Sequence, residues 1–378
     1  MSTLTRDQVV ALRIRAQQLD REPVDRPPTD AAIFDLGVQE TGRDGASWAL
    51  VNRGVPLGSQ DELYECPDVV LVWTLRGAPH FYRRAEIVDV LAATSPYSDG
   101  DAAKRLIGAA TPLEQAGIGP REGLRVVARE LRTVVDRPRA KGEVSTRLSE
   151  RLDDAYLRDC RRCDASHVWE LPFRYGALYA GLELVPGTSP PILRRIPGWP
   201  RRTAGPVADP SEAPEHLRPI RACLQFLGPL TQQQVAGFLD AAVADVKEHW
   251  PVDAIEVVVD GKRSSMLGDP DPPDPARDLV RLLGPFDLLL QCRDRQLLVP
   301  DKARHKALWP SIGRPGAVLV GTDLVGTWRP RASGAKLGLR IELWDSVSKA
   351  VRARIEIEAE RLAAHRGLAL SGVTGESC

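Results

Sequence analysis

The polar residues Gln39 and Glu40 interrupt the stretch DLGVQETGRDGASWALVNRG, where a short apolar helix is expected to give way to a turn. A glutamine can orient a water molecule through its amide N–H and its carbonyl oxygen, and a nearby carboxylate can accept a proton. If residues 39–41 are extended, Gln39 and Thr41 project to one side and Glu40 to the other. The stretch is a candidate hydrolytic site of Gln39 and Thr41. Its carboxylate would be Asp44 or Glu40. The alternative is that Gln39 caps a helix end and RDG forms an ordinary turn.

Composition limits the class of protein. The chain has 378 residues, 43% of them hydrophobic, which suggests roughly two to four compact units. It lacks an apolar run long enough for a membrane span and the order of a signal peptide, so a cytoplasmic location is expected. The six cysteines are too scattered for a disulfide framework. Basic and acidic residues balance at 51 each, so no overall attraction to phosphate is predicted. The basic residues are mostly arginine, which suits bidentate phosphate contacts but equally reflects genome composition.

Helices followed by short hairpins recur along the chain, which is the order of a winged helix. The first set has helices at 4–19 and 31–36 and a hairpin-like run at 68–84. The second has helices at 121–136 and 142–157 and extended runs at 182–196. The third is the clearest, because Thr231 and Gln234 have capping-box spacing and Asp260–Gly261 fits a two-residue hairpin turn. It combines helices at 216–228, 230–239 and 241–251 with a hairpin at 255–267.

A proline-rich segment at 268–278 separates these units from a last region. That region has three β-like runs, at 286–291, 316–328 and 337–345, and a charged helix at about 346–365. The expected fold class is therefore α+β, with tandem winged-helix units and a small C-terminal α+β domain. The expected domains are 1–100, 101–205, 206–268 and 269–378.

The sequence YLRDCRRCDASH offers Cys160, Cys163 and His167 as metal ligands. A structural zinc site needs four ligands, and no second C-x-x-C or H-x-x-x-H is present. A redox role would need a thioredoxin-like βαβ context, which this region lacks. Two half-buried cysteines on a helix are therefore expected, with no metal and no cofactor.

Four landmarks occur in order along the chain: VQET with WALVNRG, VWTLRGAPHF, LLGPFDLLLQCRDRQLL, and VGTWRPRASGAKLGLRIELWD. Together they resemble the winged helix DNA-binding domain-containing family of AlkZ/YcaQ-like DNA glycosylases, over roughly residues 4–366. The resemblance implies tandem winged helices forming a concave DNA-binding face. It also implies monofunctional excision of alkylated bases, including N7-alkylated purines in crosslinks, without a metal. The family's Gln-x-Gln or Gln-x-Asp motif falls on Gln39, Glu40 and Thr41, so Gln39 matches and Thr41 departs from it.

The implied reaction suits these residues. An N7-alkylated purine is a cationic leaving group, so a strong general acid is dispensable. The site must hold one water beside C1′ and stabilise an oxocarbenium-like sugar. Thr41 can hydrogen-bond a water but cannot act as a base at neutral pH, so Glu40 or Asp44 would supply any carboxylate.

The expected partner is double-stranded, damaged DNA at the nucleoid, with no membrane and no obligate protein partner. Acidic residues on the third unit's apparent recognition helix, at 240, 245 and 248, indicate a scaffold instead of a major-groove reader. The candidate DNA contacts lie on turns and arginine-rich segments. They are Arg53, Arg76, His80, Tyr82, Arg83, Arg84, Arg174, Arg194, Arg195, Arg201 and Arg202.

Two other classes of protein stay open. A non-catalytic winged-helix DNA-binding or regulatory protein could keep the fold while carrying Thr41 in place of the second catalytic residue. A protein-interaction scaffold would show absent or salt-insensitive DNA binding. Convergence of Gln39, Arg76 and His80 on one cleft would favour an enzyme, whereas their separation would favour a scaffold.

Overall fold

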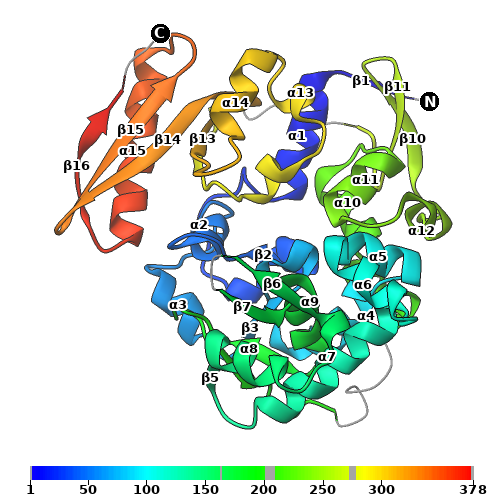
Figure 1. The fold of residues 1–378 in the computed structure, drawn as a ribbon. Coiled ribbons are helices and arrows are strands. Elements are labelled where there is room, and N and C mark those ends of the chain that lie inside the picture. The colour runs from blue at the N-terminus through cyan, green and yellow to red at the C-terminus, as the bar shows by residue number, and fades with distance from the viewer. Residues whose placement is uncertain (1, 162–163, 201–208, 272–277, 376–378) are drawn as a thin grey trace.

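The computed structural model describes the chain except residues 1, 162–163, 201–208, 272–277 and 376–378. It is a mixed α+β fold, which confirms the expected class. Figure 1 shows the C-terminal sheet and the hairpin of β10 and β11 at opposite ends of an upper layer, with α1 between them. Helices α4 to α9 and the short sheets of the first 200 residues form the layer beneath.

The N-terminal segment packs with residues from the third expected unit. Helix α1 (Arg6–Ala16) begins at a capping box in which Thr5 and Gln8 bond each other's backbone N–H. Strand β1 (Thr3–Leu4) pairs in parallel with β10 (Ile255–Val259). The expected division into units 1–100 and 206–268 therefore places two strands of one sheet in different units.

A small antiparallel sheet carries the candidate motif. Strand β4 (Pro79–Arg83) lies between β2 (Val38–Gln39) and β3 (Val69–Trp73). The helix expected at 31–36 is replaced by two 3-10 turns, η1 (Pro28–Asp30) and η2 (Ala32–Asp35). Helices α2 (Gly45–Val51) and α3 (Gln60–Glu65) follow β2.

Helices dominate the next hundred residues, and they cover two small sheets. The strand order β5–β9–β8 forms the first sheet, and β6 pairs with β7 in a hairpin. The helix expected at 142–157 ends at Ser149, and Cys160 lies on a strand, so the prediction of a helix around this cysteine is wrong. The elements are α4 (Ile87–Thr94), α5 (Asp99–Leu106), α6 (Ala110–Gln115), α7 (Pro120–Val134), β5 (Arg139–Ala140), α8 (Lys141–Ser149), β6 (Leu157–Cys160), β7 (Ala165–Val168), α9 (Glu170–Tyr179), β8 (Leu182–Leu184) and β9 (Ile192–Arg195).

The third expected set of elements is present in the order read from the sequence. Helices α10 (Pro219–Leu227), α11 (Gln232–Leu239) and α12 (Val243–Glu248) precede the hairpin of β10 and β11 (Lys262–Met266). The capping box of Thr231 and Gln234 starts α11. Asp260 and Gly261 both have positive φ, 48° and 73°, as a tight two-residue hairpin turn requires.

The C-terminal region is a five-stranded sheet in the order β12–β13–β14–β15–β16, packed against α15 (Lys349–His365). Its strands are β12 (Val280–Leu283), β13 (Gly316–Val320), β14 (Asp323–Ser333), β15 (Lys336–Leu343) and β16 (Ala369–Thr374). The β-like run expected at 286–291 is instead a 3-10 turn, η10 (Leu288–Gln291), because the Asp287 carboxylate accepts the Leu289 N–H and caps the turn. Short helices α13 (Arg295–Leu298) and α14 (His305–Leu308) follow. Within the described residues, none of the helices combines the length and apolar character needed to cross a membrane.

Candidate active site

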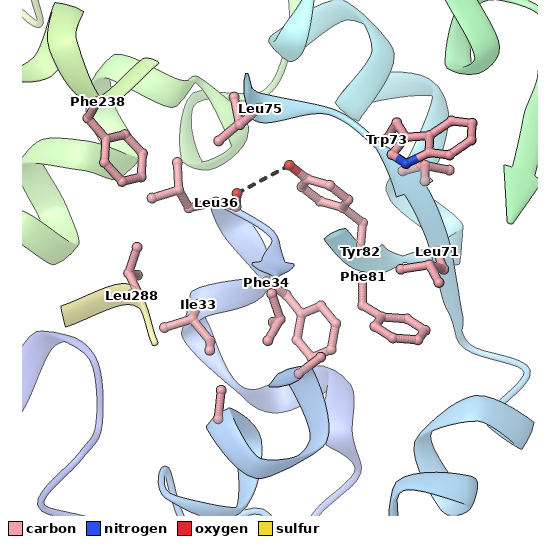
Figure 2. Packing of buried hydrophobic residues seen from close by; sticks show 14 of the residues in the cluster. Ile33, Phe34, Leu36, Leu71, Trp73, Leu75, Phe81, Tyr82, Phe238 and Leu288 are labelled. Atoms are coloured by element: carbon pink, nitrogen blue, oxygen red, sulfur yellow. Dashed lines mark hydrogen bonds between the residues drawn. The ribbon is translucent and has the colours of Figure 1, made fainter. Parts of the chain in front are cut away.

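A glycine turn and a buried tyrosine fix the entry into β2. Gly37 has φ 85°, a left-handed conformation that favours glycine. A Cβ atom there would lie 2.4 Å from the Tyr82 ring, so any side chain would displace the ring. The Tyr82 hydroxyl donates to the Leu36 carbonyl at 3.2 Å, as Figure 2 shows among the surrounding core residues. The turn therefore holds the strand that presents Gln39.

The Gln39 amide is oriented at both of its ends. Its Nε2 donates to Thr41 Oγ1 at 2.9 Å, so Gln39 and Thr41 lie on one side of the extended segment, as predicted. Its Oε1 accepts from Arg76 Nη2 at 3.2 Å. One amide hydrogen and one carbonyl lone pair stay available for a water or a substrate.

Arg76 closes one side of the site. It has φ 57° in the turn between β3 and β4, an uncommon conformation for a side-chain-bearing residue. Its guanidinium lies 4.5 Å from the centre of the Phe238 ring and donates to the Phe238 carbonyl at 3.0 Å and to Gln291 Oε1. Burial lowers the pKa of Arg76. Among the described residues its side-chain hydrogen bonds go only to neutral groups, while Asp240 acts on it from a longer distance and raises its pKa.

His80 lies directly opposite Gln39 across the β2–β4 ladder. Paired residues of an antiparallel ladder project from the same face, so the two side chains are neighbours. The imidazole is 2% exposed, and its Nδ1 lies 2.9 Å from the Ala78 carbonyl oxygen and 3.0 Å from Thr74 Oγ1. Burial, with a smaller effect of Arg76, lowers the pKa of His80 to about 3, so the ring is neutral.

These side chains line one small cavity. Its polar lining is Gln39, Arg76, His80 and Gln291, and its apolar lining includes Phe238 and Phe286. The cavity volume is about 10 Å³, which is about the room that one water molecule needs. Gln39, Arg76 and His80 thus line one cavity.

The two candidate carboxylates have other partners. Glu40 accepts from the Tyr64 hydroxyl at 2.6 Å and from the Ala46 N–H at 2.8 Å, and burial raises its pKa. Asp44 forms a two-point ion pair with Arg366, at 2.6 and 2.9 Å. Each oxygen of both groups is therefore already bonded, and neither carboxylate joins Gln39. The site is reduced to Gln39 and Thr41 with the neighbours described above.

Three candidate DNA contacts are corrected by their burial. Arg53 is 0% exposed and pairs with Asp287 through both terminal nitrogens, at 2.8 and 3.0 Å. His80 and Tyr82 are each 2% exposed, and both serve the network beneath β2. Phosphate cannot reach side chains enclosed in this way, so their prediction as DNA contacts is wrong for this structure.

Most of the other candidate arginines are partly exposed and partnered. Arg83 pairs with Asp35 and Glu86, and Arg174 with Glu170. Arg84 and Arg194 share Glu183, at 2.9 and 2.7 Å. Arg195 is exposed and donates to two backbone carbonyls. Arg201 and Arg202 lie outside the described residues.

The candidate metal ligands do not gather in the described part of the chain. Cys160 is opposite Ala165 in the β6–β7 hairpin, and His167 is opposite Arg158. No group of three His, Cys, Asp or Glu side chains suited to a metal occurs among the described residues. Cys163 lies outside them.

Phe238, Gln291 and Thr74 complete the site but were not identified from the sequence. Phe238 lies in the last turn of α11 and Gln291 ends η10, both about 200 or more residues from Gln39 in the chain. No local pattern marks residues that meet only through tertiary packing. Thr74 stood inside the landmark VWTLRGAPHF and Gln291 inside LLGPFDLLLQCRDRQLL, so these two landmarks were the available signal.

Comparison with known proteins identifies the family. A family model described as DNA glycosylase AlkZ-like matches residues 33–365. The chain belongs to the AlkZ-like DNA glycosylase family. Membership in this family makes it a DNA-repair protein whose substrate is DNA, and confirms the resemblance drawn from the four landmarks.

A solved structure shares the fold of this AlkZ-like chain. It is Streptomyces sahachiroi DNA glycosylase AlkZ, at 19% sequence identity and a TM-score of 0.72, with 99% of this chain and 100% of that chain covered. At this identity the likeness concerns the fold. No curated protein sequence matches the chain.

Proposed function

We propose that this protein is a monofunctional DNA glycosylase that hydrolyses the N-glycosidic bond of cationic, N7-alkylated purines, including crosslinked ones, in double-stranded DNA. The observation that supports this activity best is that Gln39 lines a water-sized cavity while its amide is held by a hydrogen bond to Thr41. A strong general acid is dispensable, because the leaving base already carries a positive charge. Holding and orienting one water is then the main catalytic requirement.

The free lone pair of Gln39 Oε1 suits that requirement, because it can accept a proton of the attacking water. Thr41 holds the amide plane by accepting from Nε2 at 2.9 Å. Arg76 holds the other end at 3.2 Å. The amide of Gln39 is thus pre-organised, which saves the ordering cost at the moment of reaction.

We further propose that tandem winged helices form the DNA-binding face, with units near 1–100, 101–205, 206–268 and 269–378. The pairing of β1 with β10 would complete the third unit. The accessible arginines that suit phosphate contacts are Arg83, Arg84, Arg174, Arg194 and Arg195, with Arg76 nearest to Gln39. The expected working place is the nucleoid, where damaged DNA is found.

The direct test uses duplex DNA containing one N7-methylguanine, with a nitrogen-mustard crosslink as a second substrate. Wild type is expected to produce alkali-labile abasic sites, and Gln39→Ala to lose at least about 100-fold in single-turnover rate. Gln115→Ala is the matched control, since Gln115 is an exposed residue at the end of α6. DNA binding without base release on either substrate would contradict the proposal and support a non-catalytic DNA-binding protein.

A further inference from the structure

A chain of hydrogen bonds beneath β2 determines which nitrogen of His80 carries the proton. The Leu36 carbonyl can only accept, so the Tyr82 hydroxyl donates its hydrogen there. Thr74 Oγ1, 3.2 Å from the Tyr82 oxygen, is then the donor of that bond. The Ala78 carbonyl, 2.9 Å from His80 Nδ1, can likewise only accept. Nδ1 is therefore the protonated nitrogen of His80.

The other ring nitrogen, Nε2, is then a bare acceptor. Among the described residues it has no hydrogen-bond partner, whereas Nδ1 contacts Thr74 and Ala78. Neither Thr74 nor Ala78 lines the cavity, but His80 does. The edge of the ring opposite Nδ1 thus faces the cavity that Gln39 lines.

From this geometry we propose that His80 Nε2 is a second water-orienting group of the site. It acts where the site has no carboxylate, because Thr41 carries none and Glu40 and Asp44 bond to other groups. The inference rests on the proposed glycosylase function and deepens it. A water that donates one hydrogen to Gln39 Oε1 and the other to His80 Nε2 keeps its lone pairs free. It is thereby oriented as a nucleophile towards C1′ of a bound lesion.

The hydrolysis balances with these groups. The water oxygen bonds to C1′ while the C1′–N9 bond breaks, and the electron pair goes to N9 and neutralises the cationic alkylpurine. One water proton passes to Nε2 and then to solvent. Because burial and Arg76 lower the pKa of His80 to about 3, the ring is a neutral acceptor before the step. The protonated hydroxyl formed at C1′ is a much stronger acid than the imidazolium, so it gives up its proton to Nε2, which releases it to solvent.

Two substitutions separate this role from the structural role of Nδ1. In His80→Asn the amide nitrogen can replace the Nδ1–H donor, but nothing replaces Nε2. In His80→Gln a polar atom reaches the position of Nε2, but the bond to Ala78 is lost. The expected result is that His80→Asn folds normally, binds N7-methylguanine duplex like wild type, and loses about 10- to 100-fold in single-turnover rate. His80→Gln is expected to be less stable yet to keep a rate within about tenfold of wild type.

His249→Asn is the matched control, because His249 Nδ1 also contacts a backbone carbonyl, that of Asp245 at 2.9 Å, beside a different cavity. Its rate should equal that of wild type. An active wild type with an equally active His80→Asn would overturn the role of His80 and leave the glycosylase function intact. Rates that follow stability across the variants would also overturn it. A wild type that releases no base would overturn both proposals.

Discussion

Thr41 is the residue at which this chain departs from the family motif, and its hydroxyl still has a partner. Because it accepts from Gln39 Nε2 at 2.9 Å, Thr41→Val should free one end of the amide without changing the volume much. A neutral hydrogen bond of this kind contributes about 1 kcal/mol, so we expect a roughly fivefold lower single-turnover rate with unchanged DNA affinity. Thr41→Ser, which keeps the hydroxyl, should retain the rate. A valine variant as fast as wild type would show that Thr41 does not position Gln39.

The low pKa of His80 predicts that the stability of the protein depends on pH. Its pKa is about 3 in the folded protein, mainly through burial with a smaller effect of Arg76, and about 6.5 when unfolded. Below pH 6.5 the unfolded chain binds the extra proton, so the free energy of unfolding falls as the pH falls. Between pH 7.5 and 5.5 this single group should remove about 1 kcal/mol.

Urea denaturation of wild type and His80→Asn at pH 7.5, 6.5 and 5.5 measures this effect. Other groups titrate equally in both proteins, including His365, whose pKa burial also lowers. The free energy of unfolding of wild type should therefore fall by about 1 kcal/mol more than that of His80→Asn over this range. Parallel curves would mean that His80 takes up a proton in the folded protein at the same pH as in the unfolded chain.

At the scale of elements, an ion pair ties the segment after the motif to the end of α15. Asp44 precedes α2 and Arg366 follows α15, and both side chains are almost fully buried. Removing one partner of such a pair leaves an uncompensated charge, which costs about 3 kcal/mol. Arg366→Met should lower the free energy of unfolding by this amount.

Chemical denaturation of Arg366→Met, Asp44→Asn and the double variant tests the pair. The double variant should be less destabilised than the sum of the single variants, because it leaves no unpaired charge. Arg329→Met, at an exposed arginine of β14, serves as the control and should change stability by less than about 0.5 kcal/mol. Additive effects of the two single variants would contradict a direct pair.

At the scale of the whole molecule, the candidate site is assembled from regions far apart in the chain. The sheet of β2 and β4 supplies Gln39 and His80, α11 supplies Phe238, and η10 supplies Gln291. The C-terminal region also holds α2, because Trp48 Nε1 and Asn52 Nδ2 both donate to the Leu282 carbonyl, at 2.6 and 3.1 Å. The site thus depends on packing between the N-terminal sheet and the elements after residue 230.

Local elements followed largely from the sequence. Capping boxes at Thr5 and Thr231 started their helices, and the Asp260–Gly261 pair made the hairpin turn, because these signals act within a few residues. Three elements were predicted wrongly. The helix expected at 31–36 became 3-10 turns, the apolar run at 286–291 became a 3-10 turn once Asp287 capped it, and the region of Cys160 became a hairpin. Short apolar or mixed runs fit several local structures equally well, so their surroundings decide between them.

The sequence by itself determined that Gln39 and Thr41 share one side of an extended segment, since side chains alternate along any strand. Its ordered landmarks also determined the family. Tertiary structure alone decided which charged side chains are free to bind DNA or take part in catalysis. It paired Arg53 with Asp287 and Asp44 with Arg366, and it placed the neutral His80 opposite Gln39. Burial and partners set the state of an ionisable group, and both are properties of the packed molecule that residue type does not carry.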